Sequence, residues 1–165
     1  MRSLCASILL PSLLLGGASA LAAPPVGKGF GDWGIEAESR LDQPNRYFVT
    51  QSVLFKDKKQ RLLKVGIGYL GPKGEPMISA DLPLGVALDP GAELRVDDQP
   101  PVKLSFHVCM PSGCIASTTL TPAQLKAMTT AKTLGILALP SGADRPQFLR
   151  LSSNGLAEAL EGLKE

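Results

Sequence analysis

Cys109-Met110-Pro111-Ser112-Gly113-Cys114 places two cysteines on either side of a four-residue turn. In the preceding segment the apolar residues Val102, Leu104, Phe106 and Val108 alternate with polar ones, which is the pattern of a strand with one buried face. Pro111 and Gly113 occupy positions that a type I turn favours. The segment therefore predicts a β-hairpin whose two strands are cross-linked by a Cys109–Cys114 disulfide.

Short strand-like segments continue on both sides of this hairpin. Apolar residues repeat at alternate positions in 47–55 and 63–69, and further segments are expected at 76–80, 84–88, 94–96, 115–120, 134–139 and 148–151. Turn signals such as Asp89-Pro90-Gly91 separate them. We predict an all-β fold, a β-sandwich or barrel-like domain of about seven to nine short antiparallel strands.

Two short helices are expected among the strands. Thr121 as the N-cap and Pro122 as the first helical residue start one of them. The second begins after Asn154, and its apolar positions at spacings of three and four form one stripe that is expected to pack on the sheet: Leu156, Ala159, Leu160 and Leu163.

The N-terminus has the features of an export signal. Arg2 supplies positive charge, 4–15 are mostly apolar, and small residues favour cleavage near Ala20 to Ala23. The apolar run is shorter than the ~18 residues that a membrane-spanning helix needs. We therefore expect a signal peptide at 1–22, a flexible lead at 23–29, and a single β domain at 30–165 that is periplasmic or secreted and does not span a membrane.

Charge and cysteine content narrow the function further. The formal net charge is +2, and Lys and Arg are scattered among Asp and Glu, so a nucleic-acid partner is not expected. Loss of Cys5 with the signal leaves Cys109 and Cys114, an even number that favours a disulfide in an oxidising compartment.

Two other functions for the cysteine pair stay open beside the structural disulfide. Redox enzymes usually place two residues between their cysteines at the start of a helix, whereas this pair has four within a hairpin. Regular alternation puts His107 and Cys109 on one face with Cys114 opposite, but the fourth ligand of a zinc site is not evident. We expect no metal and no cofactor.

The remaining residues give no catalytic motif. His107 is the one histidine, and no Gly-x-Ser-x-Gly sequence is present, so we do not expect an enzyme. Trp33 is the one tryptophan and is expected to pack in the core or at its rim.

Several motifs together resemble the invasion-associated locus B family of exported bacterial proteins. They are Phe30-Gly31-Asp32-Trp33, Gln51-Ser52-Val53, Leu82-Pro83-Leu84-Gly85-Val86 and the cysteine hairpin, in that order. The resemblance implies an exported, β-rich protein of a Gram-negative bacterium, which pathogenic members use in host-cell entry. Members generally carry an additional cysteine pair, whose places here are taken by Ala37 and, approximately, Tyr47.

These observations favour a non-enzymatic binding or envelope-associated protein. The expected binding loop is the hairpin tip formed by His107, Met110, Pro111 and Ser112. A loop that is already fixed loses less entropy when it binds, which is the physical advantage of the staple. The partner would be an envelope or host protein that no motif identifies, and the oligomeric state is left open. The alternative is a periplasmic thiol, redox or metal-dependent accessory protein that uses His107, Cys109 and Cys114.

Overall fold

The computed structural model describes residues 23–55 and 60–164. The predicted signal peptide lies outside these residues. The strands and helices, in chain order, are β1 (Gly29–Phe30), β2 (Trp33–Arg40), β3 (Gln43–Leu54), β4 (Arg61–Gly68), β5 (Met77–Leu82), β6 (Ala92–Val96), β7 (Val102–Met110), β8 (Gly113–Thr119), α1 (Pro122–Met128), β9 (Leu134–Ala138), β10 (Gln147–Leu151) and α2 (Leu156–Glu161).

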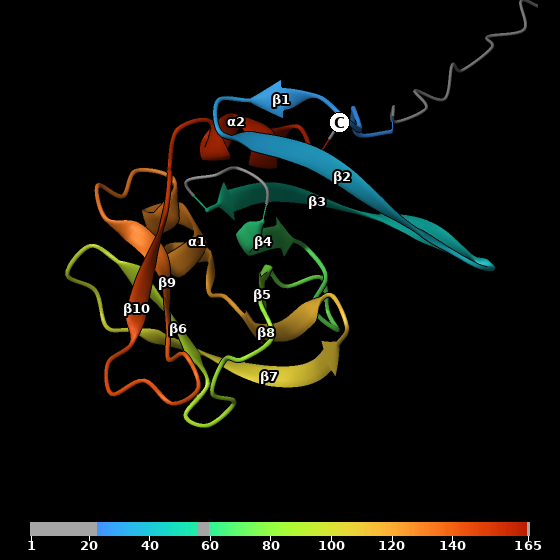
Figure 1. The fold of residues 1–165 in the computed structure, drawn as a ribbon. Helices are drawn as coiled ribbons and strands as arrows, with labels where there is room; N and C mark the ends of the chain where they lie inside the picture. The colour runs from blue at the N-terminus through green and yellow to red at the C-terminus, as the bar shows by residue number, and fades with distance from the viewer. Residues whose placement is uncertain (1–22, 56–59, 165) are drawn as a thin grey trace, which may run out of the picture.

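All described strands belong to one curled antiparallel sheet. Its order is β1-β2-β3-β4-β5-β8-β7-β6-β9-β10, and the curl brings β10 back against β3 to form a half-barrel. Figure 1 shows β2 and β3 continuing beyond the rest of the sheet as a two-stranded ribbon. The all-β prediction is confirmed, and residues 23–55 and 60–164 contain ten strands instead of the seven to nine expected.

Alternation along the strands builds the core. Leu63, Val65 and Ile67 of β4 are fully buried, as the period of two predicts. Gly66 lies between Val65 and Ile67, and Gly68 ends the strand; a Cβ at Gly66 would lie 3.5 Å from the Phe48 ring, and one at Gly68 would lie 3.1 Å from the Phe48 Cβ. Glycine at these positions therefore lets Phe48 pack closely against the strand.

Both predicted helices are present. The Thr121 hydroxyl accepts from the Gln124 N–H at 3.2 Å, and the Gln124 side chain accepts from the Thr121 N–H at 2.8 Å, which completes a capping box. The second helix starts at Leu156 after Gly155 in the left-handed conformation, and it packs on β1, β2 and β3.

Two segments differ from the sequence prediction. Residues 84–88 form no strand, because Pro83 precedes them and Gly85 takes a φ of +87°, so they make a loop with a single bridge from Val86 to Pro140. Conversely, Trp33–Arg40 is a strand, although its apolar alternation is weak. The Gly27 N–H donates to the Ile35 carbonyl at 2.8 Å, so the lead before Phe30 already pairs with β2.

Ser152 is one of the residues that fasten the two ends of the curled sheet to each other. The buried Trp33 ring donates its Nε1–H to the Ser152 carbonyl at 2.8 Å, and the Ser152 N–H donates to Gln51 Oε1 at 2.8 Å. Gln51 Nε2 also donates to the Asp32 carbonyl at 3.2 Å. Trp33 thus packs in the core, as predicted, and its ring nitrogen helps to close the half-barrel.

Candidate binding surface at the disulfide hairpin

The hairpin of β7 and β8 forms as the sequence predicts. Met110 pairs with Gly113 across the turn residues Pro111 and Ser112, and Cys109 pairs with Cys114. The two cysteines form a disulfide with Cα atoms 4.0 Å apart. Both cysteines lie at paired strand positions. Cysteines that exchange disulfides usually lie at a helix N-terminus, which lowers the pKa of the thiol, and this pair does not have that placement.

A β-bulge interrupts β7 at His107. Phe106 pairs with Ala116 and Val108 with Ile115, so His107 is the extra residue. The bulge shifts the alternation, and Val108, which a regular strand would bury, is 46% exposed. The exposed His107 ring lies with Nε2 3.4 Å from the Ser117 carbonyl. The zinc geometry of a regular strand is therefore not formed, and no described group of three His, Cys, Asp or Glu is placed to hold a metal ion.

Gly113 holds the hairpin against the end of β5. A Cβ at Gly113 would lie 2.5 Å from the Leu82 carbonyl oxygen and 2.6 Å from Asp81 Oδ1, and its φ is +144°. Only glycine allows this close approach without displacement of the backbone. Because Cys114 also pairs with Leu82, the disulfide lies directly beside the Leu82–Val86 loop.

Two adjoining crevices open beside the hairpin. The first, which we call the polar crevice, has a volume of about 310 Å³ and is lined by Gln60, Arg61, Asp81, Leu82, Pro83, Leu84, Pro111 and Ser112. The second, the apolar crevice, has a volume of about 260 Å³ and is lined by Phe55, Leu62, Leu82, Pro83, Leu84, Gly85, Val86, Ala138, Pro140, Gln147 and Leu149. Leu82, Pro83 and Leu84 line both, so the two crevices adjoin each other.

The structure thus joins two motifs that are far apart in the sequence. Pro111 and Ser112 of the hairpin tip share a crevice with Leu82, Pro83 and Leu84, and Gly85 lines the adjoining crevice. His107 and Met110 do not line either crevice, although both are exposed. Phe55 and Leu62 were not singled out from the sequence, because apolar residues at strand ends give no local sign of exposure.

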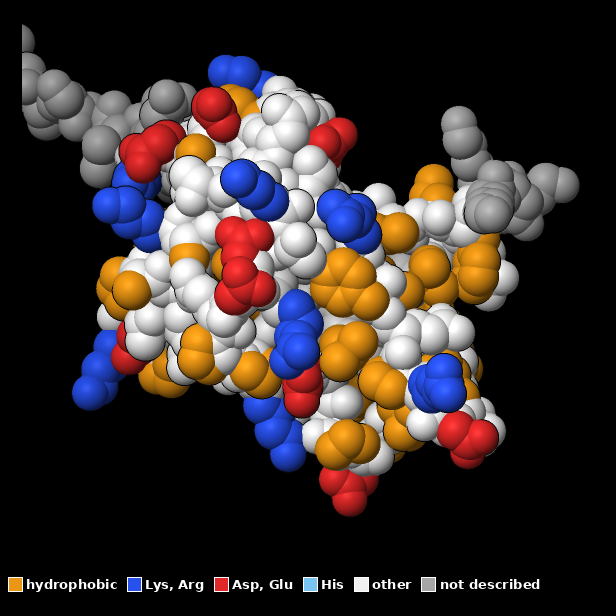
Figure 2. Space-filling view, turned by 90° about the vertical axis from the view of Figure 1, so that its left-hand side faces the viewer, with side chains coloured by type: hydrophobic (Ala, Val, Ile, Leu, Met, Phe, Trp, Pro, Cys, Tyr) orange, Lys and Arg blue, Asp and Glu red, His pale blue; other side chains and the backbone are white. Residues whose placement is uncertain are grey.

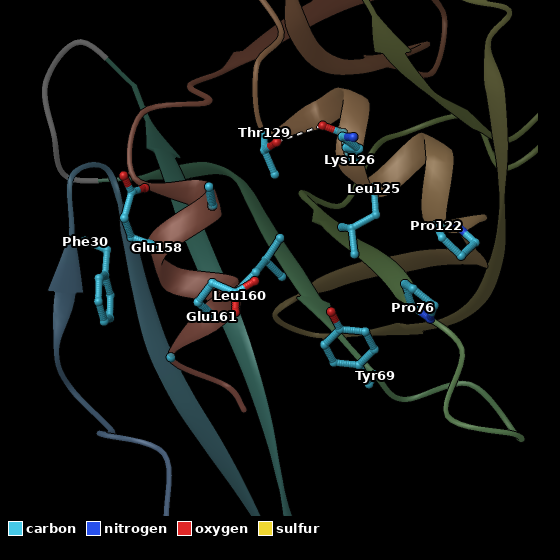
Figure 3. A pocket seen from close by; sticks show the side chains of 12 residues that line it. Phe30, Tyr69, Pro76, Pro122, Leu125, Lys126, Thr129, Glu158, Leu160 and Glu161 are labelled. Atoms are coloured by element: carbon cyan, nitrogen blue, oxygen red, sulfur yellow. Dashed lines mark hydrogen bonds between the residues drawn. The ribbon is translucent and has the colours of Figure 1, made fainter. Parts of the chain in front are cut away.

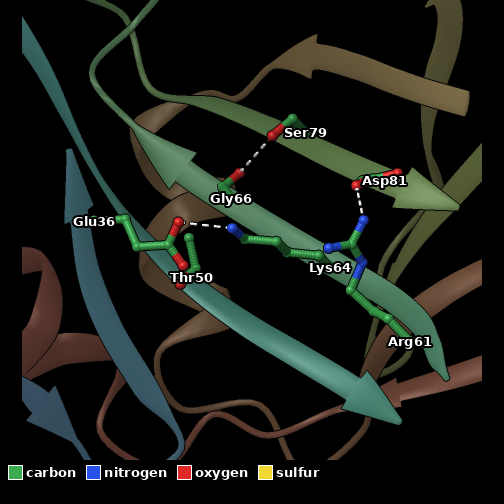
Figure 4. A network of polar contacts seen from close by, with 7 residues as sticks. All are labelled: Glu36, Thr50, Arg61, Lys64, Gly66, Ser79 and Asp81. Carbon is green, nitrogen blue, oxygen red and sulfur yellow. Dashed lines mark hydrogen bonds and ion pairs between the residues drawn. The ribbon is translucent and has the colours of Figure 1, made fainter. Parts of the chain in front are cut away.

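An ion-pair network crosses the neighbouring strands (Figure 4). Arg61 pairs with Asp81 at the polar crevice, and Lys64 Nζ lies 2.6 Å from Glu36 Oε2. The Thr50 hydroxyl donates to Glu36 Oε1 at 2.9 Å. Partial burial by itself raises the pKa of Glu36. The hydrogen bonds from Lys64 and Thr50 and the positive charges of Lys64 and Arg61 lower it by more, so the pKa of Glu36 lies below its usual value.

A separate groove of about 680 Å³ lies between the two helices (Figure 3). Phe30, Tyr69, Leu125 and Leu160 are among its apolar lining residues, and Lys126 and Glu158 are charged. It shares no lining residue with the crevices at the hairpin.

These features define a class of protein: an all-β half-barrel domain with a disulfide-closed hairpin beside two adjoining crevices. No helix among the described residues is long and apolar enough to cross a membrane.

Comparison with known proteins identifies the family. The family model described as Invasion associated locus B (IalB) protein matches residues 40–164, and the chain belongs to this family. Two invasion protein B homologs of Brucella abortus, from strain 2308 and from biovar 1 strain 9-941, are each 25% identical over 152 residues, which cover 92% of this chain and 83% of theirs. The crystal structure of invasion associated protein B from Bartonella henselae superposes with a TM-score of 0.71 at 19% identity, over 82% of this chain and 92% of that one. The fold is therefore shared.

Proposed function

We propose that this chain is an exported, non-enzymatic binding protein of the envelope or cell surface. Its partner contacts the hairpin tip and the crevice beside it. The observation that carries the proposal is the crevice that Pro111 and Ser112 at the tip share with the loop that starts at Leu82. Export is supported by the signal-like N-terminus and by the cysteine pair, and contact with a host protein is supported by the names of the relatives.

The surface has the composition of a binding site. Met110 and Leu84 are 44% and 58% exposed, while the Arg61–Asp81 pair supplies charge at the polar crevice. Exposed apolar side chains with a few polar groups beside them are typical of interaction sites. The disulfide and Gly113 hold the tip in one position, so little entropy is lost when a partner binds.

A photo-crosslinking residue at Ser112 tests the proposal. The variant protein is incubated with native envelope extract, irradiated and examined for a covalent adduct, with the same residue at the exposed Ala123 of α1 as the matched control. We expect one adduct from position 112 that is absent from position 123. An adduct formed equally from both positions, or from neither, contradicts the proposal.

Replacement of both cysteines tests the contribution of the staple. Closure of so short a loop stabilises the fold by only about 2 kcal/mol. We therefore expect the Cys109→Ser, Cys114→Ser double variant to stay folded and to lose most of the adduct at position 112. A folded variant that keeps the full adduct shows that the staple does not organise the binding surface.

A further inference from the structure

The free edge of β10 adjoins the apolar crevice. β10 is the last strand of the sheet and pairs only with β9, through five residues from Gln147 to Leu151. Figure 1 shows it beside β9, on the left of the view. A strand edge exposes backbone groups that another extended chain can satisfy.

The direction of these backbone groups follows from Ser152. Its N–H and C=O both point to the β3 side, where they bind Gln51 and Trp33. Because backbone groups alternate in direction along a strand, the N–H and C=O of Arg150 and Phe148 point to the same side, away from β9. β9 is the one described strand that pairs with β10, and no hydrogen bond outside the strand ladders reaches these four groups from a described residue. β10 therefore presents two donors and two acceptors along one edge.

Hollows border β10 at both ends, and the one at the Ser152 end, between β10 and β3, has a volume of about 470 Å³. At Ser152 the edge is fastened to β3, whereas at Gln147 and Leu149 it borders the apolar crevice. Phe55, on the other side of the crevice, is 43% exposed. Figure 2 shows hydrophobic side chains gathered on the right-hand side of the face that it draws. An added strand would thus find backbone partners on one side and apolar side chains beneath it.

We propose that an extended peptide segment of the partner adds to β10 as a further strand, with alternate apolar side chains in the apolar crevice. Five residues of β10 match a segment of about 16 Å. Arg145 precedes β10 in the chain and Arg150 lies within it, and neither arginine has an ion pair among the described residues. Acidic residues at the ends of the segment would pair with these two arginines. This inference rests on the proposed function and specifies how the partner is recognised.

A defined peptide tests strand addition in the purified protein. The probe is Glu-Val-Thr-Val-Thr-Val-Glu, and a peptide of the same composition without alternation is the control. We expect the probe to bind more tightly than the control and to slow amide hydrogen exchange at Phe148 and Arg150 by about tenfold or more. Absence of probe binding at millimolar concentration, or binding without protection at these two amides, overturns the proposal.

Two substitutions at one position separate the backbone from the side chain. Arg150→Pro removes an N–H that points to the free edge and leaves the pairing with β9 in place, whereas Arg150→Ala keeps that N–H. We expect Arg150→Pro to weaken probe binding about tenfold and Arg150→Ala to change it less than about threefold. Equal affinities of the two variants, with both folded by thermal melting, contradict strand addition.

The outcomes for the two proposals are distinct. An adduct at Ser112 together with a probe that does not bind leaves the binding function standing and removes strand addition. If the probe binds through β10 but Ser112 gives no specific adduct, β10 binds an extended peptide and the proposed binding function of the hairpin tip is contradicted.

Discussion

Single residues show how closely the backbone is packed where the chain ends meet. Gly155 has a φ of +83°, and a Cβ there would lie 1.9 Å from the Phe30 carbonyl oxygen. Gly31 opposite would place a Cβ 2.7 Å from the Asn154 carbonyl oxygen. Phe30 and Gly31 of the Phe30-Gly31-Asp32-Trp33 motif therefore lie in close backbone contact with the segment after β10.

Gly155→Ala tests this contact, and Gly74→Ala is the matched control. Gly74 has a similar φ of +76° but open space where its Cβ would lie. We expect Gly74→Ala to cost about 1 kcal/mol from backbone strain alone, and Gly155→Ala about 3 kcal/mol or more. Denaturant unfolding of both variants measures the difference. Equal losses show that the contact with Phe30 is not tight.

Glu36 makes part of the stability dependent on pH. Its pKa is below the usual value when folded, so its contribution is present above the unfolded pKa of about 4.3 and is lost as pH falls through the folded pKa. Because this surface pair is partly exposed, Glu36→Gln should cost only about 0.5 kcal/mol at pH 7. The free energies of unfolding of the two proteins should converge as the pH falls below the folded pKa of Glu36. A difference that persists there contradicts the role of the charge.

At the scale of elements, the β2–β3 ribbon and the β7–β8 hairpin are held in different ways. The hairpin has its disulfide, whereas the part of the ribbon beyond the sheet has none. Ala37 and Tyr47, at or near which the resemblance to the family places another cysteine pair, are directly opposite each other in the β2–β3 register. Two-stranded ribbons are marginally stable by themselves. A disulfide at this pairing position is therefore expected to stabilise the ribbon.

The Ala37→Cys, Tyr47→Cys double variant should form a second disulfide. Closure of this loop is expected to stabilise the fold by about 2 to 3 kcal/mol. Mass spectrometry without reductant checks the bond, and thermal melting with and without reductant measures its effect. The Ala37→Ser, Tyr47→Ser variant is the control. Two free thiols under oxidising conditions would show that the register differs from the one described.

At the scale of the whole molecule, Gln51 closes the half-barrel. Its side-chain amide bonds to the Ser152 N–H and to the Asp32 carbonyl, which join β3 to the strand ends on both sides. Gln51 is 7% exposed, so its loss leaves backbone groups unsatisfied in a region with little water. The shape of the opening beside β10 therefore depends on this residue.

Gln51→Ala should cost about 2 kcal/mol and speed hydrogen exchange at the Ser152 amide. Ser52→Ala is the control, because the neighbouring Ser52 is exposed and its side chain has no recorded hydrogen-bond partner among the described residues. Denaturant unfolding and amide exchange measure both effects. If Ser152 exchanges at the same rate in both variants, the closure does not depend on Gln51.

The sequence by itself determined the features that depend on neighbours along the chain. Period-two alternation predicted β4, the pair Thr121 and Pro122 predicted the start of α1, and the cysteine spacing predicted the stapled hairpin. Each depends on a few consecutive residues, because side-chain direction and turn geometry are local properties.

Only the tertiary structure decided which of these features meet. Nothing in the residues next to His107 indicates the bulge, which arises from pairing with β8, and Gln51 reaches Ser152 across 101 positions of the sequence. The crevice likewise needs the hairpin, the Leu82–Val86 loop and β10 to be brought together. Such contacts depend on the curl of the whole sheet, since only the curl brings its last strand back to β3.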